Sequence, residues 1–399
     1  MKNNTKNYFA LLLTLYIAST LVFSLGSNIL ITRIIDIILI GSFIVYYVLT
    51  QSIKLNMPYF ILYYFLFTVF SFASIFWSID TSSSIDISIK IFIIFINIFF
   101  IYNIAKYFAL EYYILYGILL GAFYNYLIAL DLVYYSSQYT EHFIHRFVGT
   151  SNNPNVLAIY MLFSINASIF LLQKFSNIII KIILFSNIGL AIYSIILSAS
   201  KKGALFASLL LVAYILLSLT SKKTFIWSVL SSIGLYYVFQ SDFIFKFEIF
   251  QSLLHRFDVA LSAYTSGATG GSTYERLSLI NIAYEVFSQD FGTMLFGTGQ
   301  NTFSLQNNFG LYAHNNYMEI LANLGLIGLG LFYAMHSSLF IKMNLLNNKK
   351  MKYLFITLLV ILLLMDNAMV SYAFKPTLFM FIFISLYIKN NTTKFKDNR

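Results

Sequence analysis

Apolar runs of about 20 residues recur along the whole of this 399-residue chain, and each run carries few charges. A run of that length lets a helix cross the roughly 30 Å hydrocarbon core of a bilayer. The runs are continuously apolar, whereas the strands of a membrane barrel alternate over about 10 residues. A helix also satisfies its own backbone hydrogen bonds in lipid. The sequence therefore predicts an all-α, polytopic integral membrane protein.

The composition excludes several classes of protein. Hydrophobic residues make up 59% of the chain and charged residues 10%, against roughly 45 to 50% and 25% in soluble domains. The chain has no cysteine, which excludes disulfides, Cys-ligated metals and thiol chemistry. The net charge of +10 comes from Lys and Arg in short loops between helices, so we expect anchoring at a membrane and no nucleic-acid partner.

Hydropathy divides the chain into about twelve transmembrane spans and one large loop. The run that follows Lys2 and Lys6 has no convincing small-residue cleavage site, so we predict an uncleaved first helix. The even number of spans puts both termini on the same side. We expect transmembrane helices 1–9 in residues 1–240, a large extracytoplasmic loop in 241–315, and helices 10–12 with a cytoplasmic tail in 316–399. The predicted spans are 8–25, 29–49, 58–77, 87–104, 110–130, 155–173, 178–198, 203–219, 224–240, 316–341, 353–371 and 374–388.

Charge sets the orientation. With both termini in the cytoplasm, most Lys and Arg residues fall on short cytoplasmic loops and nearly all acids fall outside, as the positive-inside rule requires. Five cations outside the membrane oppose this bias and need another explanation: Arg146, Lys201, Lys202, Arg256 and Arg276.

Arg146 precedes an Asn-Pro sequence that starts the sixth span. Asn152 or Asn153 is the expected helix cap, with Pro154 in the first helical turn. Capping alone accounts for Asn-Pro but not for an external arginine beside it. A guanidinium next to a helix N-terminus makes an anion site, and a phosphate is the ligand that we expect.

Lys201 and Lys202 stand in the tight outer turn between the seventh and eighth spans. Two adjacent lysines there either extend to lipid headgroups or bind an anionic substrate.

The large loop contains a predicted amphipathic helix at residues 272–289, which Thr273 can cap. It lies on the membrane surface or packs over the helix bundle. Glycine-rich turns flank it at residues 265–272 and 296–300, and the second is not a phosphate motif by itself. The apolar stripe of the helix is predicted at Leu277, Ile280, Ala283, Tyr284 and Phe287.

His314 opens the tenth span, and Asn315 and Glu319 share one face of the helix that follows. A neutral histidine can accept a proton from a hydroxyl, but it can also simply cap a helix. Gly325, Gly328 and Gly330 then permit close helix contact.

Metal-dependent chemistry is not expected. His142, His145 and His255 are external, but no tight ligand spacing accompanies them. Asp366, near the outer end of the eleventh span, is either a functional acid or half of a buried ion pair with Lys375.

Taken together, the motifs between residues 146 and 330 resemble the O-antigen polymerase and ligase superfamily, the Wzy and WaaL membrane glycosyltransferases. The matching features are Arg146-x2-Gly149 with Asn155, Ser198-x-Ser200, Glu275-Arg276, a Phe-Gly-Thr-Gly turn, His314-Asn315 and Glu319-x5-Gly325-x2-Gly328. The family's usual arginine after Ser-x-Ser is Lys201 here, which replaces a bidentate group by a point charge and leaves the role of that turn less defined.

The resemblance implies a GT-C-like fold and a metal-independent glycosyl transfer without a cofactor, at the outer face of a bacterial plasma membrane. The donor would be an undecaprenyl-pyrophosphate-linked glycan and the acceptor a hydroxyl of another glycan, with chain-length regulator and flippase proteins as further partners. His314 would then be the catalytic base and Arg276 the main phosphate clamp. Further contacts to pyrophosphate or glycan would come from Arg146, Lys201, Lys202, Arg256, Asn155, Asn315 and Glu319.

Three functions stay open at this point. A polymerase for O-antigen, capsule or exopolysaccharide is preferred, because an O-antigen ligase that transfers glycan to lipid A core needs a Gram-negative outer membrane. A polysaccharide flippase or transporter would require helix breaks and charges near the middle of spans, and of the three prolines only Pro376 is placed to interrupt one.

Overall fold

The computed structural model describes residues 2–23, 29–50, 54–134, 146–218 and 271–393, and across these residues the regular structure is entirely helical. The chain divides into two compact units. Unit 1 comprises residues 1–39, 112–265 and 347–358, and unit 2 comprises 40–111, 266–346 and 359–399. The predicted all-α class is confirmed.

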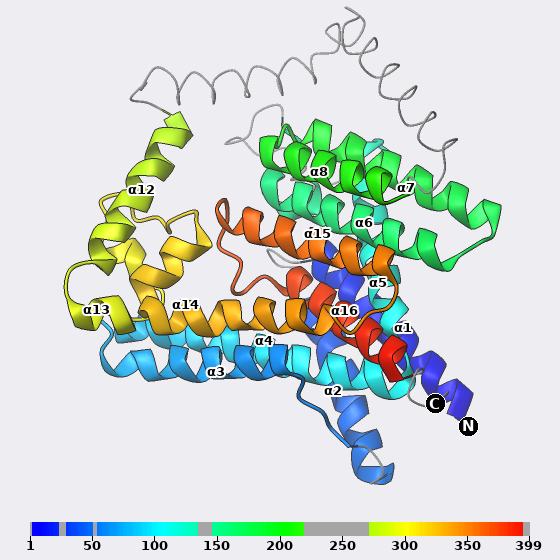
Figure 1. Cartoon of the computed structure of the whole chain (residues 1–399), viewed down its shortest axis with the longest axis horizontal. Coiled ribbons are helices and arrows are strands. Elements are labelled where there is room, and N and C mark those ends of the chain that lie inside the picture. The colour runs from blue at the N-terminus through cyan, green and yellow to red at the C-terminus, as the bar shows by residue number, and fades with distance from the viewer. Residues whose placement is uncertain (1, 24–28, 51–53, 135–145, 219–270, 394–399) are drawn as a thin grey trace, which may run out of the picture. The chain divides into compact units, whose positions relative to one another are not determined.

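Unit 1 is built around α6 (Pro154–Lys174), most of whose residues are buried. Helices α7 (Ile178–Leu197) and α8 (Lys201–Ser218) both pack against it (Figure 1). The unit also contains α1 (Lys2–Val22), the first part of α2 (Ile29–Thr50), nearly all of α5 (Glu111–Ala129), the turn η4 (Gly149–Ser151) and the first part of α15 (Lys349–Asp366).

Buried polar side chains join three helices of unit 1. The hydroxyls of Tyr126 and Ser164 are 2.9 Å apart, and the Asn187 amide donates to Ser164 and Ser168 at 2.9 and 2.7 Å. In an apolar surrounding such groups need partners on neighbouring helices. These contacts therefore fix α5, α6 and α7 against one another.

Unit 2 holds the long helices α3 (Tyr59–Ala73), α4 (Thr81–Phe108) and α14 (Asn316–Met343), with α3 packed against both others (Figure 1). Residues 271–315, which precede α14 in the chain, are called the loop segment. The unit also contains the turns η2 (Ser74–Phe76) and η5 (Phe303–Leu305), the helices α12 (Gly271–Phe287), α13 (Phe291–Phe296) and α16 (Lys375–Thr393), and the second parts of α2 and α15.

The predicted spans correspond closely to these helices. Each one coincides with a helix except 224–240, which lies outside the described residues. Within the described part of the chain, seven helices are long and apolar enough to cross a membrane. The end of the eleventh span was wrong, because α15 stops at Asp366 rather than at residue 371 and a turn follows.

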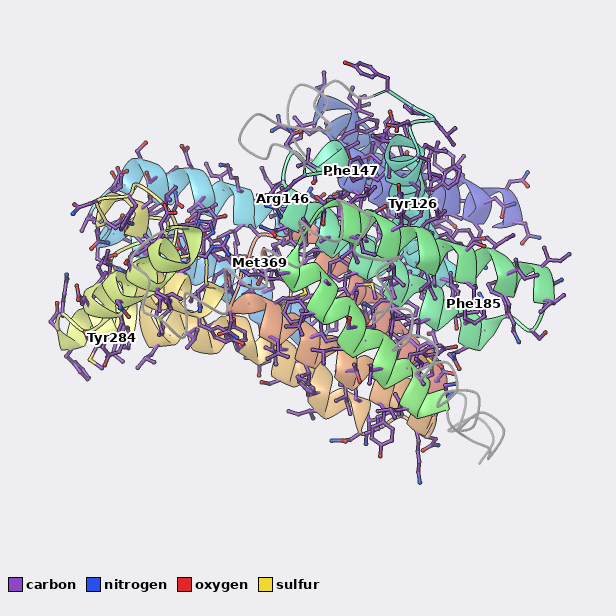
Figure 2. All side chains as sticks on the ribbon, turned by 90° about the horizontal axis from the view of Figure 1, so that it is seen from above. Tyr126, Arg146, Phe147, Phe185, Tyr284 and Met369 are labelled. Carbon is purple, nitrogen blue, oxygen red and sulfur yellow. The ribbon has the colours of Figure 1, made fainter. Side chains whose placement is uncertain are left out.

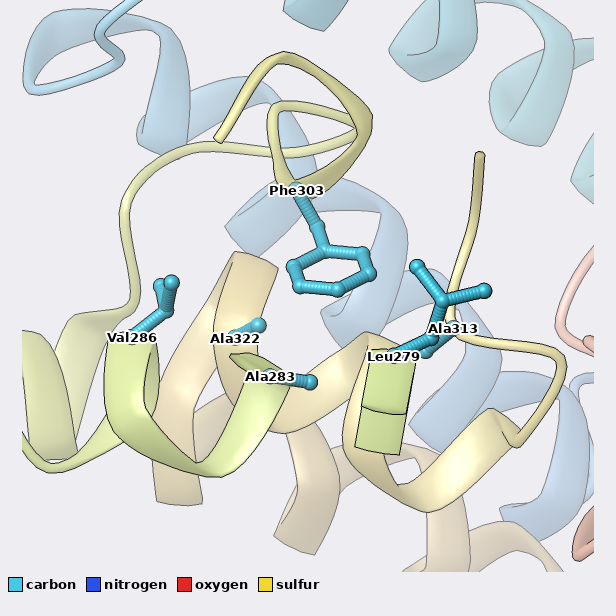
Figure 3. Close-up of a cluster of buried hydrophobic side chains, with 6 residues drawn as sticks. All are labelled: Leu279, Ala283, Val286, Phe303, Ala313 and Ala322. Atoms are coloured by element: carbon cyan, nitrogen blue, oxygen red, sulfur yellow. The ribbon is translucent and has the colours of Figure 1, made fainter. Parts of the chain in front are cut away.

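The amphipathic helix of the loop exists as α12, but its cap and its buried face differ from the prediction. It begins at Gly271, so Thr273 lies inside its first turn. Of the predicted stripe, Ala283 and Phe287 are buried, whereas Leu277 and Tyr284 are 43% and 57% exposed. Leu279 and Val286, which the prediction left out, are buried in their place; with Ala283 they form the buried face. Figure 3 shows these three side chains facing Phe303, Ala313 and Ala322 of α14, and Figure 2 shows Tyr284 on the outside of α12. The small Ala283 and Ala322 let α12 approach α14, so α12 packs over this helix.

The helix α14 is kinked at Gly325, whose φ of 63° and ψ of −164° are non-helical. A Cβ at Gly325 would lie 2.4 Å from the carbonyl carbon of Leu295. The turn after α13 crosses the helix at the same place, where a Cβ at Gly297 would lie 2.3 Å from the Asn323 carbonyl carbon. The two glycines therefore permit a backbone-to-backbone crossing that no side chain could occupy. Gly330 makes no comparable approach, since nothing lies within 4 Å of its Cβ position.

Candidate functional site

The start of α14 holds His314 in a constrained conformation. Asn315 caps the helix, its side-chain oxygen accepting from the Met318 N–H at 3.1 Å. His314 immediately before it has φ 53°, in the left-handed region. Non-glycine residues in that region are uncommon, and they persist where surrounding contacts hold them. The helix entry therefore holds the backbone of His314 in this conformation.

Tyr312 provides a second constraint on His314. The two ring centroids are 4.1 Å apart at an interplanar angle of 45°. Tyr312 is 44% exposed, so this contact lies at the surface of unit 2 and not in its core. Tyr312 was not among the residues predicted from sequence, and no motif there marked it.

Arg276 of α12 lies in the same part of unit 2. Partial burial raises the pKa of the Tyr312 hydroxyl; the positive charge of Arg276 opposes the shift, and the charge of Glu319 adds to it. Arg276 is half-buried, and among the residues that the structure describes no hydrogen-bond acceptor or carboxylate pairs with its guanidinium. Tyr312 thus contacts the ring of His314 and lies within electrostatic reach of Arg276.

Glu319 is buried, with 2% of its surface exposed, and it holds the loop that carries His314. One carboxylate oxygen accepts from the Ala313 N–H at 2.7 Å, and the other accepts from the Asn323 amide at 2.8 Å. The carbonyl oxygen of the same Asn323 amide accepts from the N–H groups of Thr302 and Phe303. Glu319 therefore connects α14 directly to the loop at Ala313 and, through Asn323, to the loop at Thr302 and Phe303.

Two backbone N–H groups of the Phe-Gly-Thr-Gly turn are hydrogen-bonded within the protein. The N–H groups of Thr298 and Gly299 each donate at 3.0 Å to the carbonyls of Ala322 and Asn323, just before the kink of α14. The turn therefore serves as a fastening between the loop segment and the helix, and these two N–H groups are not available to a phosphate.

Asp366 lies close to the start of α14 and is 3% exposed. Its carboxylate accepts from the Tyr333 hydroxyl at 2.7 Å and from the Asn316 amide at 3.4 Å. The Asn316 carbonyl oxygen in turn accepts from the N–H groups of Ser371 and Tyr372. Asp366 therefore belongs to a buried network that fixes the residue two positions after His314.

In unit 1, Arg146 is bound to the turn between α7 and α8. Its Nε donates to the Ser198 carbonyl at 2.9 Å and one terminal nitrogen donates to the Ala199 carbonyl at 3.5 Å. Ala199 is left-handed, with φ 45°. Figure 2 labels Arg146 and Phe147 at the entry to α6. The guanidinium therefore supports the turn that precedes Lys201, which gives Arg146 a structural role.

The predicted cap of α6 is confirmed. Asn153 accepts from the N–H groups of Asn155 and Val156, and Pro154 begins the helix. Asn155 accepts from the Ser200 hydroxyl at 3.0 Å, which joins the start of α6 to the turn between α7 and α8. Gly149 has φ 53°, and a Cβ there would lie 2.3 Å from the side-chain oxygen of Asn125.

The site residues predicted from sequence therefore form one group in each unit. Unit 1 contains Arg146, Asn155 and the half-buried pair Lys201 and Lys202, which begin α8. Unit 2 contains Arg276, His314, Asn315 and Glu319. Arg256, like His142, His145 and His255, lies outside the described residues. Within those described, no group of three His, Cys, Asp or Glu residues is placed to hold a metal ion.

Comparison with known protein families gives one match. Residues 187–333 match the family model described as O-antigen ligase. The matched region runs from within α7 to within α14 and so contains Arg276, His314 and the fastened turn. No curated protein matches the chain. The family match supports the resemblance to the O-antigen polymerase and ligase superfamily.

Proposed function

From membership of the O-antigen polymerase and ligase superfamily, we propose that this multi-pass membrane protein is a polysaccharide polymerase. It transfers a glycan from undecaprenyl pyrophosphate to the hydroxyl of another repeat unit, at the outer face of the bacterial plasma membrane. The product is an O-antigen, capsule or exopolysaccharide chain. The observation that carries the proposal is that Tyr312 contacts the His314 ring and also lies within electrostatic reach of Arg276, with all three residues inside the matched region.

In this reaction the acceptor oxygen attacks the anomeric carbon of the donor glycan. The bond between that carbon and the pyrophosphate oxygen breaks, and the pyrophosphate leaves with the electron pair. Arg276 stabilises the developing negative charge through two parallel N–H···O bonds. The guanidinium is suited to this role because it is half-buried and because no described residue already occupies its donors.

His314 accepts the proton from the acceptor hydroxyl. A neutral imidazole does this when a ring nitrogen lies within hydrogen-bond distance of the hydroxyl. The left-handed backbone and the Tyr312 ring hold the imidazole in one orientation, so less ordering is needed when the acceptor binds. No step in this scheme requires a metal ion or an organic cofactor.

The cations of unit 1 have a binding role in this proposal. Lys201 and Lys202 stand at the N-terminus of α8, where two positive charges oppose the helix dipole. A pyrophosphate or an acidic glycan bound there removes that opposition. We assign Arg146 and Asn155 to support of this turn and Arg256 to further pyrophosphate contact, while Asn315 and Glu319 shape the entry to α14.

O-antigen ligation is the second candidate, and the description of the matching family model favours it. In that case the acceptor is the lipid A core in place of a second repeat unit. A flippase would use a broken helix as its substrate site, and α14 is broken at Gly325. However, the carbonyls before this kink accept from Thr298 and Gly299. Packing therefore explains the break without a transported substrate.

The test uses the purified full-length protein with repeat units linked to undecaprenyl pyrophosphate, with and without lipid A core. A ladder of products without core identifies a polymerase, whereas transfer only in the presence of core identifies a ligase. Absence of any transfer under both conditions would contradict the enzymatic proposal. Loss of activity on addition of a chelator would contradict metal independence. Co-purification with chain-length regulator and flippase proteins tests the proposed partners.

A further inference from the structure

Helix α13 of the loop segment is held against the residues that follow α3 (Figure 1). Trp77 donates its indole N–H to the Phe296 carbonyl at 3.2 Å, and the centroids of the two side-chain rings are 5.7 Å apart. The Ile79 N–H donates to the Thr298 carbonyl at 3.1 Å. Trp77 also contacts Phe70 in the last turn of α3, with the ring centroids 5.8 Å apart. The tryptophan therefore joins α13 to the end of α3.

Large apolar side chains at this junction are exposed. Phe76 is 92% exposed and Phe291 is 75% exposed, and Trp77, Ile79 and Phe296 are exposed as well. We call these five residues the apolar patch. Phe291 and Phe296 begin and end α13, and no residue of this helix is buried. A group of exposed apolar side chains such as this one marks a surface that binds a partner.

The apolar patch continues the exposed face of α3, and this continuity indicates the partner. The exposed side chains of α3 are Tyr59, Leu66 and Val69, and Phe76 follows them at a spacing that places all four on one side of a helix. The segment Tyr59–Phe76 is one of those long and apolar enough to cross a membrane. The exposed face of a spanning helix lies against lipid. The partner that fits the apolar patch is therefore the bilayer.

The charges beside the apolar patch indicate how deep it lies. Asp80 caps α4 directly after Ile79, and the exposed Asp290 caps α13 directly before Phe291. A carboxylate is costly in the hydrocarbon core, whereas tryptophan is favoured at the level of the headgroups. This level suits the apolar patch and leaves both carboxylates in contact with water. Neither residues 74–84 nor residues 289–300 contain Lys or Arg, so attraction to anionic lipid is not needed.

We propose that the apolar patch enters the bilayer at headgroup level, on the side of the loop segment, and that α13 lies in the membrane surface. With six residues, α13 is far too short to span a membrane, but its two phenylalanines can enter the boundary between headgroups and acyl chains. The helix thus anchors the loop segment to the membrane. The inference is independent of glycosyl transfer, because the apolar patch shares no residue with the proposed active site.

Tryptophan fluorescence of the full-length protein in phosphatidylcholine vesicles tests this proposal. The chain has two tryptophans, Trp77 and Trp227, so Trp227→Phe leaves Trp77 as the single probe without any change in the apolar patch. Adding Trp77→Phe and Phe291→Trp moves the probe to α13. Asn308→Trp in the same background is the matched control, since Asn308 is an exposed polar residue of the same loop segment. The quenchers are phosphatidylcholine brominated near the headgroup, phosphatidylcholine brominated near the end of the acyl chains, and aqueous iodide.

Bromine near the headgroup should cause a larger loss of fluorescence than deep bromine, both for Trp77 and for the Phe291→Trp protein, and iodide should quench either of them little. The Asn308→Trp protein should show the reverse, with quenching by iodide and not by lipid. Equal quenching of the Phe291→Trp and Asn308→Trp proteins by brominated lipid would overturn the proposal. Protection of the Phe291→Trp protein from both lipid and iodide would also overturn it, because protein would then cover α13.

The lipid composition gives a second measurement. Replacement of part of the phosphatidylcholine by phosphatidylglycerol should leave the quenching by brominated lipid unchanged, because no cation lies within or beside the apolar patch in the sequence. Quenching that required phosphatidylglycerol would contradict insertion by apolar side chains. Thermal unfolding of each protein checks that the substitutions leave the fold intact, and Trp77 in the Trp227→Phe protein tests the proposal even if Phe291→Trp does not fold.

Discussion

The ring of Tyr312 lies 4.1 Å from the ring of His314, centroid to centroid, and the charge of Arg276 acts on the hydroxyl of the same tyrosine. Two residues that are far apart in sequence are thus connected through a third. His314 and Arg276 can therefore be substituted one at a time, whereas a substitution of Tyr312 would change the surroundings of both residues.

His314→Asn should abolish most of the glycosyl transfer and leave the fold intact. Asparagine adopts the left-handed conformation of position 314 more readily than most residues, but it cannot accept the proton. The expected loss is about 10²- to 10⁴-fold in kcat. The assay is glycan transfer from the undecaprenyl-pyrophosphate donor, with thermal unfolding as the check on folding. Full activity of a folded His314→Asn protein would show that another group is the base.

Arg276→Lys should retain the charge but lose the paired hydrogen bonds to the pyrophosphate. We expect a loss of roughly tenfold or more for lysine and a larger loss of about 10²- to 10³-fold for Arg276→Ala. Arg33→Ala is the control, because Arg33 is an exposed arginine of α2 in unit 1. Equal activity of Arg276→Lys and the wild type would mean that Arg276 acts as a point charge or not at all.

Gly325→Ala should destabilise unit 2, because its Cβ would lie 2.4 Å from the carbonyl carbon of Leu295 and because φ there is 63°. The expected cost is about 1 to 3 kcal/mol or more. Gly330→Ala in the same helix is the matched control, since nothing lies within 4 Å of its Cβ position; it should be neutral or stabilise the helix by about 0.5 to 1 kcal/mol. Unfolding by denaturant in detergent measures both, and similar unfolding free energies for the two variants would contradict the crossing described above.

The N-terminus of α13 should fray in acid. The N–H and hydroxyl of Thr293 donate to the capping carboxylate of Asp290, and these bonds hold its pKa below the usual value. The folded-state pKa is therefore lower than the unfolded-state pKa. The cap contributes fully above the unfolded-state value and is lost as pH falls through the folded-state value. The protection factors of the amides in residues 291–297, which compare the measured exchange rate with the unprotected rate at each pH, should fall over that range. In Asp290→Asn, which still accepts a hydrogen bond but does not titrate, this pH dependence should disappear.

Local features of the fold were predictable from sequence. The apolar runs predicted the positions of the long helices. The preference of Asn and Pro for helix starts predicted the entry to α6 at Asn153 and Pro154. Asn315 follows the same principle at the start of α14. These features depend on residues within one turn of one another, so a single sequence contains the necessary information.

Features that depend on tertiary packing were not predictable. The buried face of α12 was predicted correctly at Ala283 and Phe287 but not at Leu277 and Tyr284. Leu277 is as apolar as the buried Leu279, and packing against residues such as Ala322 selects between them. The contacts of Arg146 require the left-handed Ala199, which nothing in the sequence indicates. Tyr312 was overlooked because its link to Arg276, which lies on α12, depends on tertiary packing.

The hydrogen bonds between the 297–300 turn and α14 also relate to the order in which the chain is synthesised. The carbonyls of Ala322 and Asn323 receive N–H groups from residues that precede them in the chain. Polar backbone groups in lipid have no water to bind and need partners from the protein. Because the turn is synthesised before α14, its amides are already present when the helix enters the membrane. The order of the chain therefore makes the partners of these carbonyls available before the bent helix itself is synthesised.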